Sequence, residues 1–255
     1  MKVGCDDVIS ECLSTSIRKG VFLPSGNAPN LRFSGTDSEE LFKSNLLAQP
    51  IDWFYRNNPI EYKTNTHGYR TAEFDSIDWA NSIVIFGCSH VFGVGLHEDD
   101  TIASQLAKIT ATPVINMGIG ASSIEYSLYN SIILNQHYPT PKAVVQLYSS
   151  LSRTTYYQAG KVNHHGVWNM QKYNYMDLYS NDATHAKVHA SMAQMIIQQL
   201  WSDKTKLYEA SFLSDTSENL QIFQCKIIDN ARDFAHPGPL TTRLVASHIA
   251  TNLKL

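Results

Sequence analysis

The pattern of apolar and polar residues changes near residue 83. From there on, short continuous apolar runs alternate with longer segments whose apolar residues recur at helical spacing. Continuous runs of this length are typical of strands that are buried on both faces of a sheet. The expected strands are 83–86, 114–116, 143–147 and 206–209.

The segments between these runs predict helices at 101–109, 123–136, 183–201 and 237–253. Asp99 or Asp100 is expected to cap the first of them, Asp182 is expected to cap the third, and Pro237 is expected to begin the last. The third helix has its larger apolar side chains at helical spacing, which indicates a face turned toward the core. That stripe is made of Val188, Met192, Met195 and Ile196, with Gln199 continuing it.

The alternation of strands and helices predicts an α/β fold with a mostly parallel sheet in residues 81–255. Residues 150–182, rich in Tyr, Asn and Ser, are expected to form a loop. Residues 1–80 mix turn residues with large apolar ones such as Trp53 and Tyr55, so they are expected to form an extension or small subdomain packed on the core. Reactive groups in parallel sheets gather at the carboxyl ends of the strands, so a site is expected in the turns that follow them.

Composition narrows the function classes. The chain has 255 residues, of which 43% are hydrophobic and 17% charged, and its formal net charge is -3. These values are typical of a folded globular protein, and the charge balance argues against a general nucleic-acid binder. No apolar run is long enough to span a bilayer, and the first residues lack the apolar core of a signal peptide, so the expected location is cytoplasmic. A place within a larger particle stays open, and the oligomeric state is not indicated.

Cysteine and histidine spacing gives no sign of a metal site. The four cysteines form no CxxC pair and are expected to be reduced thiols. A disulfide between Cys5 and Cys12 is possible, because they lie seven residues apart. His185 and His189 lie one helical turn apart without a further ligand nearby, so no metal is expected. The cysteines are Cys5, Cys12, Cys88 and Cys225.

The turn after the first expected strand holds a serine among glycines. Ser89 follows the strand by two residues, with Gly87 before it and Gly93 and Gly95 after it. A serine placed there can expose both its hydroxyl and its backbone N–H to a cleft, as an acyl-transfer nucleophile requires. The plain alternative is a small residue in a turn.

Two further segments supply complementary groups. The turn 116–123 joins a strand to a helix, so its backbone N–H groups can face a developing negative charge, with Gly118, Gly120 and Ala121 as the candidates. Asp233 and His236 lie three residues apart, which allows the carboxylate to reach one imidazole nitrogen and leaves the other free to take a proton. The plain alternatives are an ordinary turn and a capping aspartate beside a surface histidine.

Taken in order, these motifs resemble the SGNH, or GDSL-like, hydrolase superfamily over residues 81–255. The resemblance implies a three-layer α/β/α sandwich with a flavodoxin-like sheet and an esterase active site. It implies that Ser89 is the nucleophile, His236 the general base and Asp233 its orienting partner, with no cofactor. The backbone N–H groups of Ser89 and of one residue within 118–121 would form the oxyanion hole.

The chain departs from the family pattern at three places. Cys88 stands where the family has an acidic residue. The family's asparagine donor after the third strand is absent, and Ser149, Ser150 and Arg153 are the candidates to replace it. Counting from Asn116 places Ala121 at the family's oxyanion glycine, and an alanine retains the backbone donor provided that its φ is not positive.

These features predict a serine esterase that acts on small-molecule or glycan esters, with O-acetyl sugars as one candidate class. Nine of the 13 tyrosines lie between residues 126 and 179, where aromatic rings could stack on sugar rings. The candidate substrate-binding residues are Tyr148, Tyr156 and Trp168. Two alternatives remain open at this point: a weak or inactive glycan-binding or structural module of the same fold, and an O-acyltransferase.

Overall fold

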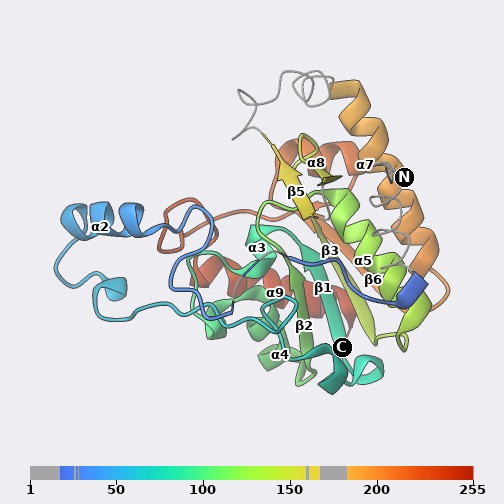
Figure 1. The fold of residues 1–255 in the computed structure, drawn as a ribbon, viewed down its shortest axis with the longest axis horizontal. Helices are drawn as coiled ribbons and strands as arrows, with labels where there is room; N and C mark the ends of the chain where they lie inside the picture. Colours follow the sequence, from blue (N-terminus) through green and yellow to red (C-terminus); the bar gives the residue numbers. More distant parts are fainter. Residues whose placement is uncertain (1–17, 26, 28, 159–160, 167–182, 255) are drawn as a thin grey trace, which may run out of the picture.

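The computed structural model describes residues 18–25, 27, 29–158, 161–166 and 183–254. Its centre is a parallel sheet of five strands in the order β2-β1-β3-β6-β7 (Figure 1). Counted along the sheet's own strands this order is 2-1-3-4-5, the flavodoxin-like arrangement. The strands are β1 (Ile83–Gly87), β2 (Val114–Gly118), β3 (Ala143–Tyr148), β6 (Lys206–Ser211) and β7 (Phe223–Gln224).

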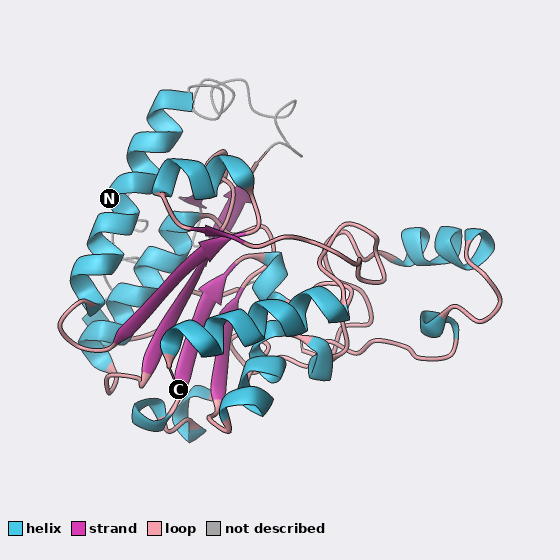
Figure 2. Cartoon of the chain, turned by 180° about the vertical axis from the view of Figure 1, so that it is seen from behind, coloured by secondary structure: helices cyan, strands magenta, loops and turns pink. Residues whose placement is uncertain are grey.

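Helices cover both faces of this sheet (Figure 2), so the chain forms the expected three-layer α/β/α sandwich. Alternate residues of β1 divide between the two faces. Val84 and Phe86 pack in the cluster that includes Ile133 and Ile197, whereas Ile83 and Ile85 pack in the opposite cluster. The first cluster is covered by α5 (Ile124–His137) and α7 (Ala183–Trp201), and the second by α4 (Ile102–Thr110) and α9 (Pro239–Leu253).

The expected strands and long helices are present with small shifts at their ends. Helix α4 begins one residue later than expected because Thr101 is its cap, accepting from the Ser104 N–H, while Asp99 and Asp100 lie in a preceding 3-10 turn, η4 (Glu98–Asp100). Helix α9 begins at Pro239 rather than Pro237, with Gly238 before it. A short helix, α8 (Ser214–Leu220), was not expected, and Asp182 lies outside the described residues.

Two expectations were wrong. Residues 150–182 are not simply a loop, because β4 (Thr154–Gln158) and β5 (Lys161–His165) form an antiparallel hairpin. The larger apolar stripe of α7 does not face the core, since Met192 and Met195 are 56% and 68% exposed. The face buried against the body has smaller residues and ends at Trp201, which is fully buried; it consists of Ala190, Ala193, Ile197 and Trp201.

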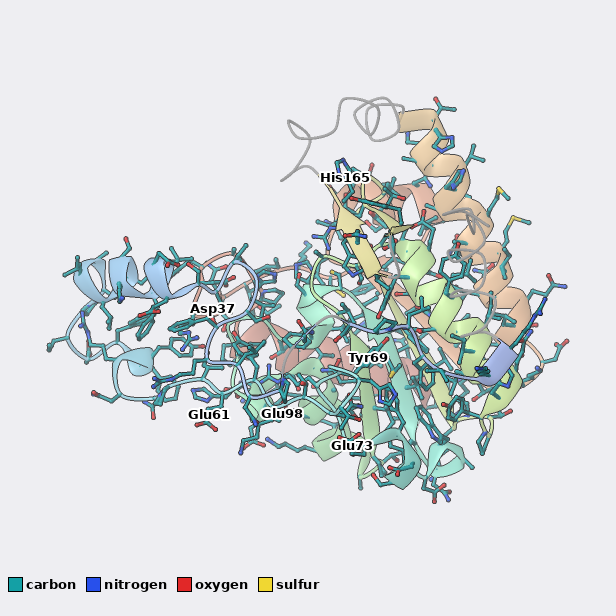
Figure 3. All side chains as sticks on the ribbon, viewed as in Figure 1. Asp37, Glu61, Tyr69, Glu73, Glu98 and His165 are labelled. Carbon is teal, nitrogen blue, oxygen red and sulfur yellow. The ribbon has the colours of Figure 1, made fainter. Side chains whose placement is uncertain are left out.

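The N-terminal segment before β1 contains α2 (Glu39–Ala48) and the 3-10 turns η1 (Phe54–Arg56), η2 (Phe74–Ser76) and η3 (Trp79–Asn81). The region around α2 and η1 projects from the side of the sandwich in Figure 1. The rest of the segment is built into the body, because Phe22, Tyr69 and Trp79 belong to the same buried cluster as the sheet. Figure 3 shows Tyr69 against the sheet and Asp37 nearer the projecting part. The division of the chain at residue 80 stays a prediction.

Within the described residues, no helix is long and apolar enough to cross a membrane. Cys88 and Cys225 are buried free thiols, and Cys5 and Cys12 lie outside the described residues.

Candidate active site

The turn after β1 places Ser89 at the carboxyl end of the sheet. Cys88 is extended, and Ser89 then begins the one-turn helix α3 (Ser89–Phe92), which ends at Gly93 with φ 81°. This helix packs directly on β2, where a Cβ on Gly118 would come 2.4 Å from the Phe92 nitrogen. A glycine at 118 is therefore what lets the turn that carries Ser89 lie against the neighbouring strand.

The structure brings the three sequence-predicted side chains together. The Ser89 hydroxyl lies 2.8 Å from His236 Nε2, and His236 Nδ1 lies 2.6 Å from Asp233 Oδ2. Ser89, Asp233 and His236 are 7%, 3% and 8% exposed. In the tautomer with the proton on Nδ1, His236 donates to Asp233 and accepts from Ser89, which is the arrangement that transfers a serine proton to imidazole.

The segment 230–237 closes on itself to hold these two side chains. Ala231 donates its N–H to the His236 carbonyl at 2.9 Å, and Phe234 takes the left-handed conformation between them. Asp233 Oδ1 accepts from the N–H groups of Ala235 and His236, each at 3.2 Å. The three-residue spacing thus forms an aspartate turn that aims both side chains the same way.

The same contacts keep Asp233 ionised. Its burial acts to raise the pKa, but the hydrogen bond and charge of His236 outweigh that effect. Hydrogen bonds from Thr36 and Ala235 act in the same direction, so the pKa of Asp233 lies below its usual range. A carboxylate at this position stabilises an imidazolium as it forms.

The backbone donors near Ser89 differ in availability. The Gly118 N–H donates to Asn116 Oδ1 at 3.0 Å, so this candidate is already bound. Among the described residues, the N–H groups of Gly120 and Ala121 have no partner, and both residues line the cavity that holds Ser89. The condition that Ala121 should not have a positive φ is not met: its φ is 64°. This alanine therefore has a backbone conformation that glycine favours.

A cavity of about 470 Å³ opens over Ser89 and His236. The body of the fold lines it with Val94, Gly120, Ala121 and Arg153. The N-terminal segment lines it as well, through Asn27 and the three consecutive residues Ser34, Gly35 and Thr36. Most of the surface that these residues expose in the cavity is apolar, and Arg153 adds one guanidinium.

The candidates for the third oxyanion donor separate clearly. Ser149 is buried and does not line the cavity, while the Ser150 hydroxyl is engaged with Ser152 Oγ at 2.9 Å. Arg153 is the candidate that lines the cavity beside Ser89.

The aromatic candidates for substrate binding do not line the cavity. Tyr148 is buried and donates its hydroxyl to Glu209 Oε1 at 2.7 Å, so it serves the packing between β3 and β6. Tyr156 lies on the β4–β5 hairpin and is half-buried outside the cavity. Trp168 lies outside the described residues.

The pKa of the Cys88 thiol is lowered by its neighbours, although burial acts in the opposite direction. Burial acts to raise the pKa of the thiol, but the charge and hydrogen bond of His90, together with Arg153, outweigh it and hold the pKa well below its usual range. The lowered pKa favours the ionised form of Cys88, which directly precedes Ser89. The His90 ring also contacts the His236 ring, with centroids 5.4 Å apart.

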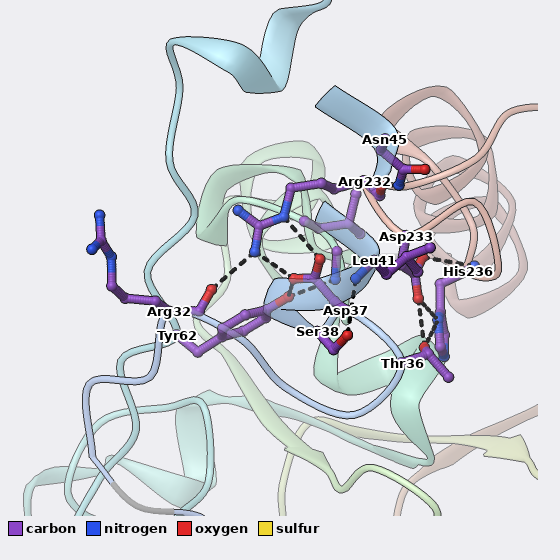
Figure 4. A network of polar contacts seen from close by, with 12 residues as sticks. Arg32, Thr36, Asp37, Ser38, Leu41, Asn45, Tyr62, Arg232, Asp233 and His236 are labelled. Carbon is purple, nitrogen blue, oxygen red and sulfur yellow. Dashed lines mark hydrogen bonds and ion pairs between the residues drawn. The ribbon is translucent and has the colours of Figure 1, made fainter. Parts of the chain in front are cut away.

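Sequence reasoning missed two residues of the N-terminal segment that support the site. Thr36 donates its hydroxyl to Asp233 Oδ2 at 2.6 Å (Figure 4). Arg70 is buried and donates to the carbonyls of Gly93 at 2.8 Å and Leu96 at 3.0 Å, which fixes the end of the nucleophile turn. Arg70 follows a turn held by Asn65, whose side chain accepts from the backbone N–H groups of His67 and Tyr69.

The described part of the chain holds no group of three or more His, Cys, Asp or Glu side chains placed to bind a metal ion. The rings of His185 and His189 lie against each other at a tilt of 39°, with centroids 4.1 Å apart.

Comparison with known proteins gives distant structural likenesses only. No family model matches the chain, and no curated protein matches its sequence. Three similar solved structures are a carbohydrate esterase family 2 enzyme with a carbohydrate-binding domain from Corynascus thermopiles (Myceliophthora fergusii), an acetyl xylan esterase from the rumen bacterium Butyrivibrio proteoclasticus, and a member of the lipolytic G-D-S-L family from Veillonella parvula.

Their identities to this chain are 14%, 10% and 12%, and their TM-scores are 0.43, 0.43 and 0.41. The likenesses cover 69%, 77% and 68% of this chain. They cover 67%, 66% and 97% of those chains, so this chain spans about two thirds of the length of the first two. At this level of similarity, the geometry around Ser89 carries the functional argument.

Proposed function

We propose that this chain is a serine esterase that hydrolyses carboxylic esters through an acyl-enzyme. One observation carries the proposal: a serine hydroxyl, an imidazole and a carboxylate lie in hydrogen-bonded sequence at 2.8 and 2.6 Å, beside a cavity. Ser89 and His236 are 147 positions apart in the chain, so local turn formation does not account for their contact.

In the proposed reaction, Ser89 Oγ attacks the ester carbonyl while its proton passes to His236 Nε2. Asp233 holds the imidazole in the tautomer that can accept this proton and stabilises the resulting cation. His236 then gives the proton to the leaving alcohol as the C–O bond breaks. Water, deprotonated by His236, attacks the acyl group and releases the acid and the free serine.

The negative charge that develops on the carbonyl oxygen would be held by backbone N–H groups of Ser89 and of Gly120 or Ala121. Arg153, which also lines the cavity, would supply the third donor. One donor of this kind is worth roughly 100- to 1000-fold in turnover, so replacing the family's asparagine matters to the rate.

The cavity, of about 470 Å³, has room for a short acyl group, and its walls carry polar groups from Thr36 and Arg153. Residues 81–255 would form the catalytic domain, to which residues 1–80 add a wall. O-acetyl sugars are the first substrates to screen.

The test is hydrolysis of a chromogenic short-chain ester by the wild type and by Ser89→Ala. The Ser89→Ala variant should lose about a thousand-fold or more in kcat. Ser247→Ala is the matched control, because its hydroxyl bonds only within the exposed face of α9. Full activity in Ser89→Ala would overturn the proposal, and acylated product in the presence of an added alcohol would replace hydrolysis by acyl transfer.

A further inference from the structure

A tight turn in the N-terminal segment reaches the triad. Ser34 and Asp37 exchange two backbone hydrogen bonds, of 3.0 and 3.1 Å, so that only Gly35 and Thr36 lie between them. Gly35 occupies the first of these two positions with φ 61°. Two-residue hairpin turns favour glycine there, because they need a positive φ. The backbone of Thr36 is therefore fixed by a closed two-residue turn, not carried on an open loop.

The Thr36 side chain completes the set of donors around Asp233. Oδ1 of Asp233 accepts from two backbone N–H groups, and Oδ2 accepts from His236 Nδ1 and from Thr36 Oγ1, both at 2.6 Å. Thr36 Oγ1 also lies 3.3 Å from His236 Nδ1. The hydroxyl thus sits against both groups whose mutual orientation sets the histidine tautomer.

The next residue anchors the turn to the segment that carries Asp233. Asp37 pairs with Arg232 through Nε–Oδ1 at 2.8 Å and Nη2–Oδ2 at 2.6 Å, and both side chains are 2% exposed. Tyr62 also donates to Asp37, and its oxygen accepts from the Gly95 N–H at 2.7 Å. Two adjacent residues, Thr36 and Asp37, therefore hold two adjacent residues, Asp233 and Arg232 (Figure 4).

We propose that Thr36 is a positioning residue of the triad, and that the Ser34–Asp37 turn is the clamp that holds its hydroxyl on Asp233. This inference rests on the proposed esterase function. The clamp fixes the carboxylate so that Oδ2 stays aimed at His236 Nδ1, which keeps Nε2 free to take the serine proton. The N-terminal segment would then be part of the catalytic centre as well as a wall of the cavity.

The experiment compares Thr36→Val, which removes the hydroxyl and keeps the branched shape, with Thr36→Ser, which keeps the hydroxyl. A hydrogen bond to a charged group is worth enough to predict a kcat about ten- to a hundred-fold lower in Thr36→Val. KM should stay within about two-fold, since the loss falls on the transition state. Thr36→Ser should retain most of the wild-type kcat.

Thr205→Val is the matched control, because it removes one hydroxyl hydrogen bond, to the Pro141 carbonyl, far from the site. It should lose a similar amount of stability and no activity. A Thr36→Val enzyme with wild-type kcat, or a Thr36→Ser enzyme as slow as Thr36→Val, would overturn the inference.

A second readout does not need turnover. The proton on His236 Nδ1, followed by NMR in the full chain, should exchange faster with solvent in Thr36→Val and at the wild-type rate in Thr36→Ser. If the wild type hydrolyses no ester, the proposed function fails, and this measurement alone decides the role of Thr36. Unchanged exchange in Thr36→Val would then refute the clamp.

Discussion

Asp37 and Arg232 form a buried ion pair with two hydrogen bonds. Arg232 directly precedes Asp233 in the chain. The pair joins the N-terminal segment to the segment that carries the triad's carboxylate and histidine. Both charged groups have further partners: Tyr62 donates to Asp37, and Arg232 donates to the Arg32 carbonyl at 2.9 Å. Because these contacts are satisfied on both sides, removing one partner strands a buried charge.

Asp37→Asn should therefore destabilise the protein by about 3–5 kcal/mol, the usual result of breaking a buried pair from one side. The measurement is urea denaturation of the variant and the wild type. Lys43→Ala is the contrast within the same segment, since its pair with Glu39 has side chains 69% and 56% exposed. Exposed pairs contribute little to stability, so Lys43→Ala should leave the free energy of unfolding almost unchanged. Equal losses in the two variants would show that burial of the Asp37 pair has no energetic consequence.

The backbone conformation of Ala121 predicts that a glycine there makes the protein more stable. Its φ is 64°. The left-handed conformation costs an alanine about 1–2 kcal/mol, and glycine avoids that cost. Ala121→Gly should raise the free energy of unfolding by about 1 kcal/mol while the backbone N–H stays in place, so kcat should not fall. Ala111, at the end of α4 with φ 50°, provides the control: Ala111→Gly should stabilise similarly without any effect on turnover. A destabilised Ala121→Gly, with Ala111→Gly stabilised, would contradict this reading of the turn.

Arg70 should resist conservative replacement. Its guanidinium reaches the carbonyls of Phe92, Gly93 and Leu96 at once, and its Nε faces Glu98. A lysine keeps the charge but cannot span the same carbonyls, because its donors share one atom. Arg70→Lys should lower stability by about 1–3 kcal/mol, as expected for buried carbonyls left unpaired, and should slow ester hydrolysis. Thermal unfolding and kcat together check this, and a variant with wild-type values for both would remove Arg70 from the support of the site.

The lowered pKa of Asp233 predicts how stability depends on pH. An unperturbed aspartate has a pKa of about 3.9. The pKa of Asp233 in the folded protein is lower, so folding favours its ionised form. That contribution is fully present above about pH 5 and is lost as the pH falls through the folded pKa, because the unfolded chain then binds the proton more readily. The difference in unfolding free energy between the wild type and Asp233→Asn should shrink on acidification below about pH 4. A difference that is constant from pH 6 to pH 3 would show that the pKa of Asp233 is not depressed.

The sequence predicted those parts of the fold that depend on local pattern. Strands β1 and β3 are buried on both faces, so their continuous apolar runs were readable, and the Asp233–His236 spacing forms its own turn. The helix α7 shows the limit. Its small residues, such as Ala190 and Ala193, and its larger ones, such as Met192, both recur at helical spacing on opposite faces. Which face is buried depends on how closely α5 approaches, and the pattern does not encode that.

The support of the site was unpredictable for a related reason. Thr36 and Asp233 are 197 residues apart, and a threonine beside a glycine carries no local mark of a triad contact. The availability of Gly118 was misjudged because its N–H is bound by the side chain of Asn116, two residues earlier. The candidate catalytic residues stand in local motifs, whereas the contacts that hold Asp233 and Arg232 in place come from residues that are 197 and 195 positions away in the chain.

The central claim is that Ser89 is an activated nucleophile, and covalent capture tests it most directly. A fluorophosphonate probe is added to the wild type and to Ser89→Ala, and the modified peptide is located by mass spectrometry. The account predicts one adduct on Ser89 in the wild type, none in Ser89→Ala, and slow labelling in His236→Gln, in which the base is missing. An unlabelled wild type, or an adduct on another residue that persists in Ser89→Ala, would contradict it.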